Sequence, residues 1–177
     1  MTTLETVECG DHIFGIYSNK EAELDEALTF LKDGLDKNEI IMLVTHGISK
    51  DEIRTKMSKE WNVNVNALES GEHIIIKTTK EWYYPNNVPN IKRITFGWES
   101  LVEIARIRNK KGLRVFADMS GFFKDGFAKE VVDYESTLES KFDFPLTAIC
   151  ACRTQDVANL TSEELKLLNE HHNAVWR

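Results

Sequence analysis

Proline, glycine and cysteine are all scarce in this chain. Its 177 residues include three prolines, nine glycines and three cysteines. This composition excludes collagen-like, proline-rich and low-complexity proteins, which need far more glycine or proline. The small, odd number of cysteines does not suit a disulfide framework and is typical of reduced thiols in a cytosol. We therefore expect one globular, cytoplasmic domain spanning residues 1–177.

Long apolar segments and an excess of basic residues are also missing. No apolar run reaches the roughly 18 residues that a membrane-spanning helix needs. The first residues, MTTLETVE, show neither the basic start nor the apolar stretch of a secretion signal. The formal net charge is −7, whereas a nucleic-acid-binding domain normally presents a basic face. We therefore expect neither a membrane nor a nucleic acid as a partner.

What the sequence does contain is an alternation of amphipathic segments with short apolar runs. The spacing of apolar residues predicts helices at about 20–36, 50–60, 91–110, 127–138 and 165–172. Capping boxes begin at Ser18, Ser49 and Thr161, and Gly112 is expected to cap the helix that starts at Ile91.

The apolar runs at 12–17, 40–44, 73–76, 113–117 and 146–151 are predicted strands. Most are apolar at nearly every position, which is typical of parallel strands covered by helices on both faces. The alternation therefore predicts an α/β fold, a three-layer sandwich with a mostly parallel central sheet. Ligands of such sheets bind where the carboxyl ends of the strands lead into loops.

The element order resembles a nucleotide-binding core, but the phosphate-binding loop is missing. One predicted strand ends in Asp118, as in a Walker B element. The turn GIYSNKE at 15–21 lacks the second glycine and the lysine followed by serine or threonine that a P-loop requires. We expect no ATP hydrolysis from this turn. Residual nucleotide binding through Asp118 and backbone amides near Ser18 is an alternative.

Several stretches covering nearly the whole chain resemble the MEDS domain, the methanogen/methylotroph DcmR-type sensory domain. They read HIFGIYSNKEAELDEALTFLKDGLDKNE, EWNVNVNALESGEHIIIKTTKEWYYPNNVPN, GLRVFADMSGFFKDGFAKEVVDYE, and FPLTAIC with LLNEHHNAVW. The resemblance implies a degenerate RecA-like or circadian-clock-type ATPase core. It also implies a role in sensing small hydrocarbon-derived compounds, alongside a sensor kinase or a DNA-binding regulator.

Aromatic residues cluster at two of the expected strand ends. Trp82, Tyr83 and Tyr84 stand in the proline-punctuated segment 82–89. They could form a lid over a pocket for a small apolar or methylated ligand, or they could pack over the edge of the sheet. A ligand would order this segment and change a surface that a partner reads.

The segment after Asp118 offers a second set of candidates. Phe122 and Phe123 could complete an apolar cavity in which Asp118 and Ser120 orient the ligand, or they could simply cover the next helix.

The histidines and cysteines are weaker candidates. His12 and Tyr17 bracket the first strand, and His12 is either a ligand contact or, as we favour, a buried hydrogen-bonded side chain. His46 follows the second strand alone. Adjacent helical residues such as His171 and His172 point about 100° apart, so they do not share one ion easily. The thiols in 150–152 are expected to be buried small hydrophobic groups.

The leading hypothesis is a cytoplasmic small-molecule sensing domain that carries out no turnover, with no cofactor, metal or catalytic residues. Two alternatives remain. One is a degenerate nucleotide-binding module, and the other is an interaction protein, such as an oligomeric adaptor for a sensor kinase. A homo-oligomer is left open.

Overall fold

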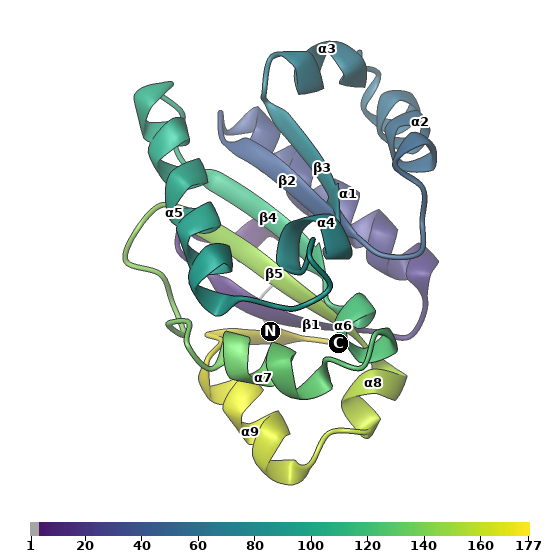
Figure 1. The fold of residues 1–177 in the computed structure, drawn as a ribbon. Coiled ribbons are helices and arrows are strands. Elements are labelled where there is room, and N and C mark those ends of the chain that lie inside the picture. Colours follow the sequence, from purple (N-terminus) through teal and green to yellow (C-terminus); the bar gives the residue numbers. More distant parts are fainter. Residues whose placement is uncertain (1–3) are drawn as a thin grey trace.

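The computed structural model describes residues 4–177, which form a six-stranded sheet with helices on both faces (Figure 1). The strands are β1 (His12–Tyr17), β2 (Ile40–Thr45), β3 (Ile74–Thr78), β4 (Leu113–Asp118), β5 (Leu146–Arg153) and β6 (Ala174–Trp176). The helices are α1 (Lys20–Asp36), α2 (Lys50–Trp61), α3 (Val65–Ser70), α4 (Thr79–Tyr83), α5 (Ile91–Ile107), α6 (Ser120–Lys124), α7 (Ala128–Glu135), α8 (Thr154–Ala158) and α9 (Ser162–Glu170), preceded by a 3-10 turn, η1 (Leu4–Thr6).

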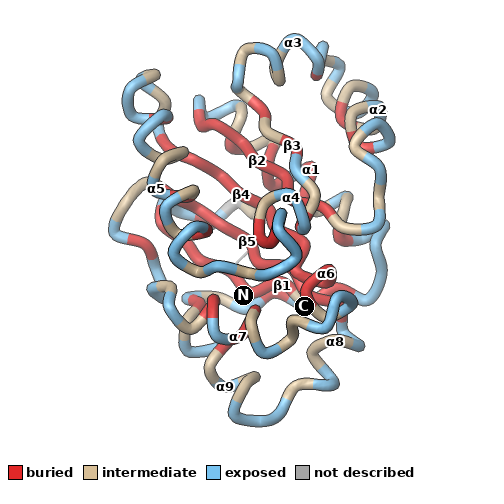
Figure 2. Tube along the Cα trace, in the orientation of Figure 1, coloured by how far each residue is buried: buried red, intermediate tan, exposed pale blue. Residues whose placement is uncertain are grey.

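The strands lie in the order β3-β2-β4-β5-β1-β6, and every pairing between them is parallel. The expected α/β architecture with a parallel central sheet is therefore confirmed. β2, β4 and β5 are buried along their whole length, as their mostly apolar sequences indicated (Figure 2). Arg114 and Thr147 are buried with them.

Each face of the sheet has its own core, because neighbouring residues of a strand point to opposite faces. Ile13 and Phe116 pack with α1, α2 and α3 on one face. Phe14, Val115 and Ala148 pack with α4, α5, α6, α7 and α9 on the other. α5 and α7 lie in front of the sheet in Figure 1 and α1 lies behind it. The site described below lies on the face covered by α5 and α7.

Two of the expected caps are wrong. α1 begins at Lys20, so its N-cap is Asn19, whose side chain accepts a hydrogen bond from the amide of Ala22. Ser18 lies one residue too early to form the expected box. The boxes at Ser49 and Thr161 are confirmed.

Gly112 does not cap α5. That helix ends at Ile107, and Asn109 takes the left-handed conformation just beyond it, with φ of 56°. Gly112 is needed for another reason. A Cβ atom there would lie 2.6 Å from the carbonyl oxygen of Pro145, so only glycine allows this close approach of two chain segments.

Short elements escaped prediction because they carry too few residues for a periodic pattern. These are α3, α4, α6, α8 and β6. α4 matters most, since it makes Trp82 and Tyr83 helical where we expected a loop. The expected last helix also ends at Glu170, so His172 lies beyond it.

No helix in residues 4–177 is long and apolar enough to cross a membrane. The first three residues of the segment inspected for a secretion signal lie outside the described residues.

Candidate functional site: an apolar cavity beside a buried polar cluster

A cavity of about 170 Å³ lies between the sheet and the helices α5 and α7. Its floor is formed by β4 and β5, including Ala117 and Ala148, and its walls include Tyr83, Trp98 and Tyr134. The two alanines leave room that larger side chains would fill, so the space arises from small residues facing large aromatic ones. The cavity therefore lies over the middle of the sheet face, not at the carboxyl ends of the strands.

The aromatic wall is held by one hydrogen bond. The indole Nε1 of Trp98 donates to the hydroxyl of Tyr134 over 2.7 Å. The ring of Tyr83 lies 5.7 Å from that of Tyr134 and 6.2 Å from that of Trp98, in edge-to-face contacts. Burial raises the pKa of both tyrosines well above the ordinary value, so both hydroxyls keep their protons.

The hydroxyl of Tyr83 is a second polar group in this wall. Tyr83 is buried, with 1% of its surface exposed, yet within the described part of the chain its hydroxyl makes no hydrogen bond. A buried hydroxyl normally has a partner. The Tyr83 hydroxyl is therefore available to a ligand in the cavity.

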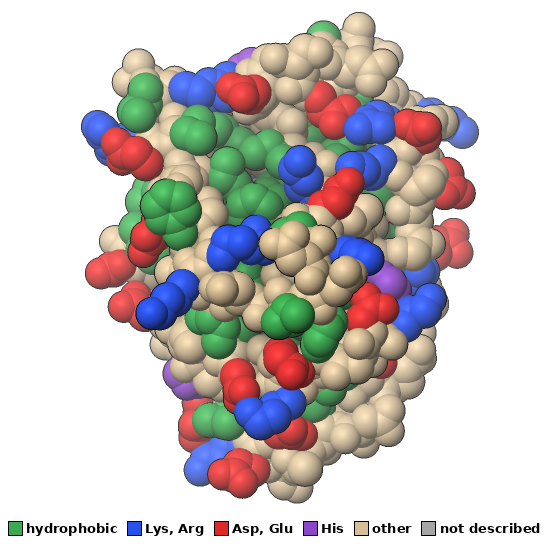
Figure 3. Space-filling model, in the orientation of Figure 1, with side chains coloured by type: hydrophobic (Ala, Val, Ile, Leu, Met, Phe, Trp, Pro, Cys, Tyr) green, Lys and Arg blue, Asp and Glu red, His purple; other side chains and the backbone are tan. Residues whose placement is uncertain are grey.

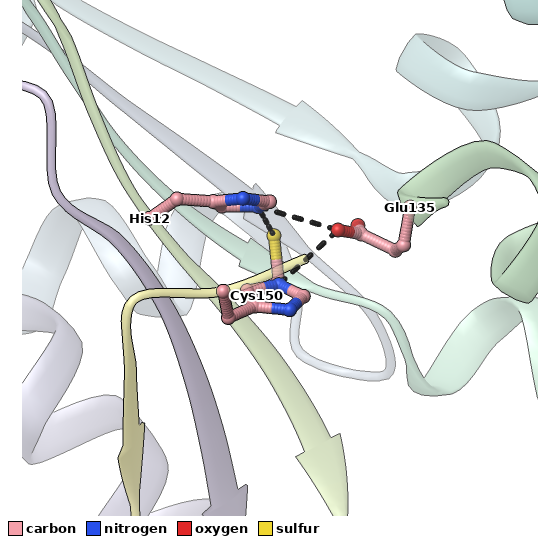
Figure 4. A group of neighbouring side chains, drawn as sticks. His12, Glu135 and Cys150 are labelled. Carbon is pink, nitrogen blue, oxygen red and sulfur yellow. Dashed lines mark hydrogen bonds and ion pairs between the residues drawn. The ribbon is translucent and has the colours of Figure 1, made fainter. Parts of the chain in front are cut away.

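A cluster of four polar side chains borders the cavity. It consists of His12, Glu135, Cys150 and His172, which are all buried. Each residue offers one nitrogen, oxygen or sulfur atom, and these four atoms lie within 4.8 Å of one another. His12 and Cys150 also line the cavity. Figure 4 shows His12 and Cys150, from neighbouring strands, facing Glu135 at the end of α7.

Glu135 stands at the centre of this cluster. Its Oε2 lies 3.3 Å from Nε2 of His12 and 3.2 Å from Nε2 of His172. The Sγ of Cys150 lies 3.5 Å from Nε2 of His12. Neither carboxylate oxygen of Glu135 meets hydrogen-bond geometry with a described donor, so these are close contacts and not well-aligned hydrogen bonds.

Backbone carbonyl oxygens fix the orientation of both imidazoles. Nδ1 of His12 lies 2.9 Å from the carbonyl oxygen of Glu139, and Nδ1 of His172 lies 2.5 Å from that of Leu168. A carbonyl oxygen only accepts, so each Nδ1 carries a proton and donates it. Each Nε2 is thereby turned toward Glu135.

The electrostatics of the cluster follow from its burial. Burial alone would raise the pKa of Glu135, but the two imidazoles outweigh it and hold this pKa well below the usual range. Burial, reinforced by Glu135, raises the pKa of the Cys150 thiol well above its ordinary value. Without a cation, Glu135 is therefore an anion and Cys150 a thiol.

The candidates at the carboxyl ends of the strands form a separate group. Asp118 accepts hydrogen bonds at Oδ1 from the amide and the hydroxyl of Ser120, over 2.9 and 2.5 Å. The hydroxyl of Tyr17 donates to Glu26 over 2.5 Å. The side chain of Ser18 is exposed, and the backbone carbonyl of His46 accepts a hydrogen bond from Lys20.

Acidic side chains occupy the position that a P-loop would leave for phosphates. Burial and the nearby Asp118 raise the pKa of Glu23 to about 9, although Arg153 opposes this shift. The guanidinium of Arg153 lies 3.0 Å from Glu23 and 3.7 Å from Asp118. Asp118 is thus engaged with side chains of its own chain.

The remaining aromatic candidates pack around the cavity wall. Trp82 stacks against Trp98 with ring centres 4.6 Å apart, and Phe122 is fully buried 5.0 Å from Tyr83. The hydroxyl of Tyr84 donates to Asp125. Phe123 is half-buried and borders a small void on the far side of the polar cluster.

Of the residues singled out from the sequence, His12 and Tyr83 line the cavity. Sequence reasoning missed Trp98, Tyr134 and Glu135; it took the Cys150 thiol as a buried small hydrophobic group and His172 as a packing residue. No local pattern marks these residues. The one available signal was Glu135 itself, an acid that follows the apolar face of a short helix.

Comparisons with known proteins agree with this architecture. No curated protein matches the chain. The fold is similar to that of a KaiC-like protein from the hyperthermophilic archaeon Pyrococcus horikoshii, with a TM-score of 0.61 and 13% identity, over 94% of this chain and 70% of that chain. This likeness confirms the RecA-like fold. The model of one family, described as the MEthanogen/methylotroph, DcmR Sensory domain, matches residues 11–172, so the chain belongs to the MEDS family.

Proposed function

We propose that this chain senses a small, largely apolar molecule, a simple hydrocarbon derivative, by binding it in the cavity without converting it. The family points to sensing in signal transduction. The observation that carries the proposal is the cavity of about 170 Å³ walled by Tyr83, Trp98 and Tyr134. An apolar cavity of about 150 Å³ in another protein holds benzene. The volume therefore suits a ligand of only a few heavy atoms.

The lining sets the chemistry of that ligand. Aromatic rings and small aliphatic side chains favour apolar groups, and the hydroxyls of Tyr83 and Tyr134 offer hydrogen-bond donors. The best fit is a short methylated or halogenated compound with one accepting atom. A triphosphate would find neither space nor positive charge here.

Helix α5 offers a route from the cavity to a partner. One side of α5 places Trp98 in the cavity wall, while Phe96 and Ile107 on the same helix are 69% and 65% exposed. Figure 3 shows apolar side chains gathered along this part of the surface. A ligand that fits better under one position of α5 shifts the helix toward that position. A sensor kinase or a transcription regulator would read the change, in a cytoplasmic pathway.

Ligand screening by thermal unfolding and calorimetry tests the proposal. A panel of short halogenated, methylated and hydroxylated compounds should contain at least one that raises the melting temperature saturably. At 100 times its dissociation constant, a ligand stabilises the folded state by about 2.7 kcal/mol.

Ala148→Leu is the decisive variant, because it adds atoms to the cavity floor. It should abolish binding, whereas Ala22→Leu on the exposed surface of α1 should not. Binding that survives Ala148→Leu unchanged would place the ligand elsewhere, and a panel without any binder would count against the proposal.

A further inference from the structure

We infer that His12, Glu135, Cys150 and His172 form a binding site for one zinc-type divalent ion. The inference goes beyond the proposed sensing function and does not depend on what occupies the cavity. It is carried by four observations on the cluster: the spacing of its atoms, the orientation of its imidazoles, its unpartnered buried atoms and its charge.

The spacing matches a tetrahedral site. Zinc bonds of about 2.0–2.3 Å set neighbouring ligand atoms roughly 3.3–3.8 Å apart. The contacts of Glu135 with the two histidines measure 3.3 and 3.2 Å, and that of Cys150 with His12 measures 3.5 Å. The longest separation in the cluster stays within 4.8 Å. Small side-chain movements would bring all four atoms around one ion.

The imidazoles are already arranged as metal ligands. A metal-bound histidine usually donates its other ring N–H to a carbonyl or a carboxylate, which fixes its tautomer. The carbonyl oxygens of Glu139 and Leu168 accept from Nδ1 of His12 and His172. With its Nδ1 bonded in this way, each ring is oriented so that Nε2 can offer a metal ion its lone pair at the centre of the cluster.

Buried polar atoms at that centre lack hydrogen-bond partners. Both carboxylate oxygens of Glu135 and Nε2 of His172 are unpartnered among the described residues. Buried polar atoms without partners are unfavourable, and a cation bound between the carboxylate and the imidazole nitrogens would satisfy them.

Charge and ligand type favour zinc over harder ions. A divalent cation, the Glu135 carboxylate and a Cys150 thiolate together carry no net charge, which suits a site that excludes water. Calcium and magnesium prefer oxygen ligands, whereas imidazole and thiolate suit zinc and its close neighbours. On binding, the ion would displace the proton of Cys150, which leaves to solvent while a metal–sulfur bond forms.

Metal titration tests the site directly. The full chain, stripped with a chelator and checked for folding by circular dichroism, should bind one Zn²⁺ per chain and melt at a higher temperature. Co²⁺ should bind at the same site and give the visible absorption of a tetrahedral ion, together with a thiolate-to-cobalt charge-transfer band. A folded chain that binds neither ion would overturn the inference.

Matched variants separate the site from adventitious binding. Cys150→Ser should remove the charge-transfer band and weaken Zn²⁺ binding by roughly 100-fold or more, whereas Cys152→Ser, two residues along the same strand, should change neither. His172→Gln should weaken binding, and His171→Gln should not. Equal affinity in the chain, Cys150→Ser and His172→Gln would show surface binding only and refute the site. Glu135→Gln should also weaken Zn²⁺ binding, and Cys150→Ser keeps the test valid if that variant fails to fold.

Discussion

The indole nitrogen of Trp98 donates to the hydroxyl of Tyr134 over 2.7 Å and so ties α5 to α7 beside the cavity that both residues line. Both side chains are buried, with 6% and 2% of their surfaces exposed. The bond therefore fixes the distance between two helices that wall the same cavity.

Replacing Tyr134 by phenylalanine should destabilise the fold by about 1–3 kcal/mol, because the buried N–H of Trp98 loses its acceptor. Urea unfolding measures this change. In a double-mutant cycle with Trp98→Phe, the two effects should be clearly non-additive, since the second substitution removes the orphaned donor. Additive effects would mean that the bond contributes nothing measurable.

Replacing Tyr83 by phenylalanine should change ligand selectivity with little effect on stability. Ligands with an oxygen or halogen acceptor should lose about 0.5–1.5 kcal/mol of binding free energy, and ligands without an acceptor should lose none. Calorimetry on both ligand classes measures the difference. Tyr84→Phe is the control, because that hydroxyl donates to Asp125 and does not line the cavity. A uniform loss across both classes would argue against a hydrogen bond from Tyr83.

Glu23 should make stability fall as the pH rises. Burial and Asp118 raise its pKa in the folded state from 4.5 to about 9. Between those values the unfolded chain has lost a proton that the folded chain retains, so rising pH favours unfolding. In Glu23→Gln this contribution disappears, and the variant should gain stability relative to the parent from pH 5 to pH 9. Urea unfolding at several pH values measures the free energy of unfolding of both proteins. If the two free energies changed with pH in parallel, the raised pKa of Glu23 would be contradicted.

Magnesium ATP should leave the melting temperature unchanged at millimolar concentration. Glu23 and Asp118 lie at the strand ends where phosphates would bind, and Arg153 is already engaged with both. Any ligand of the native state must stabilise it. A saturable rise in melting temperature that Asp118→Asn weakens would instead favour the nucleotide-binding alternative.

The sheet could be predicted from the sequence because its strands are short, mostly apolar runs. β1 and β4 were located within one residue, although β1 opens on His12 and β4 ends in Asp118. Caps were harder, because Ser18 and Asn19 are both good capping residues and only the start of the helix selects between them.

The site could not be predicted in the same way, because it depends on packing across the sheet. The cavity exists because Ala117 and Ala148 face Trp98, and that pairing of small and large side chains depends on how α5 lies over β4 and β5. Glu135 resembles a surface acid at a helix end until α9 and β6 enclose it. We looked at the carboxyl ends of the strands, whereas His12 opens its strand at the amino end.

The position of β6 has a consequence for folding. His172 reaches the cluster because its neighbour Asn173 is held against β1. The amide of Asn173 donates to the carbonyl of His12, and the side-chain oxygen of Asn173 accepts from the amide of His12. β6 then continues the chain as a strand paired with β1. The four side chains thus come from points in the chain up to 160 residues apart, and they assemble only once β6 has docked beside β1. Occupation of the cluster would then hold the edge of the sheet closed.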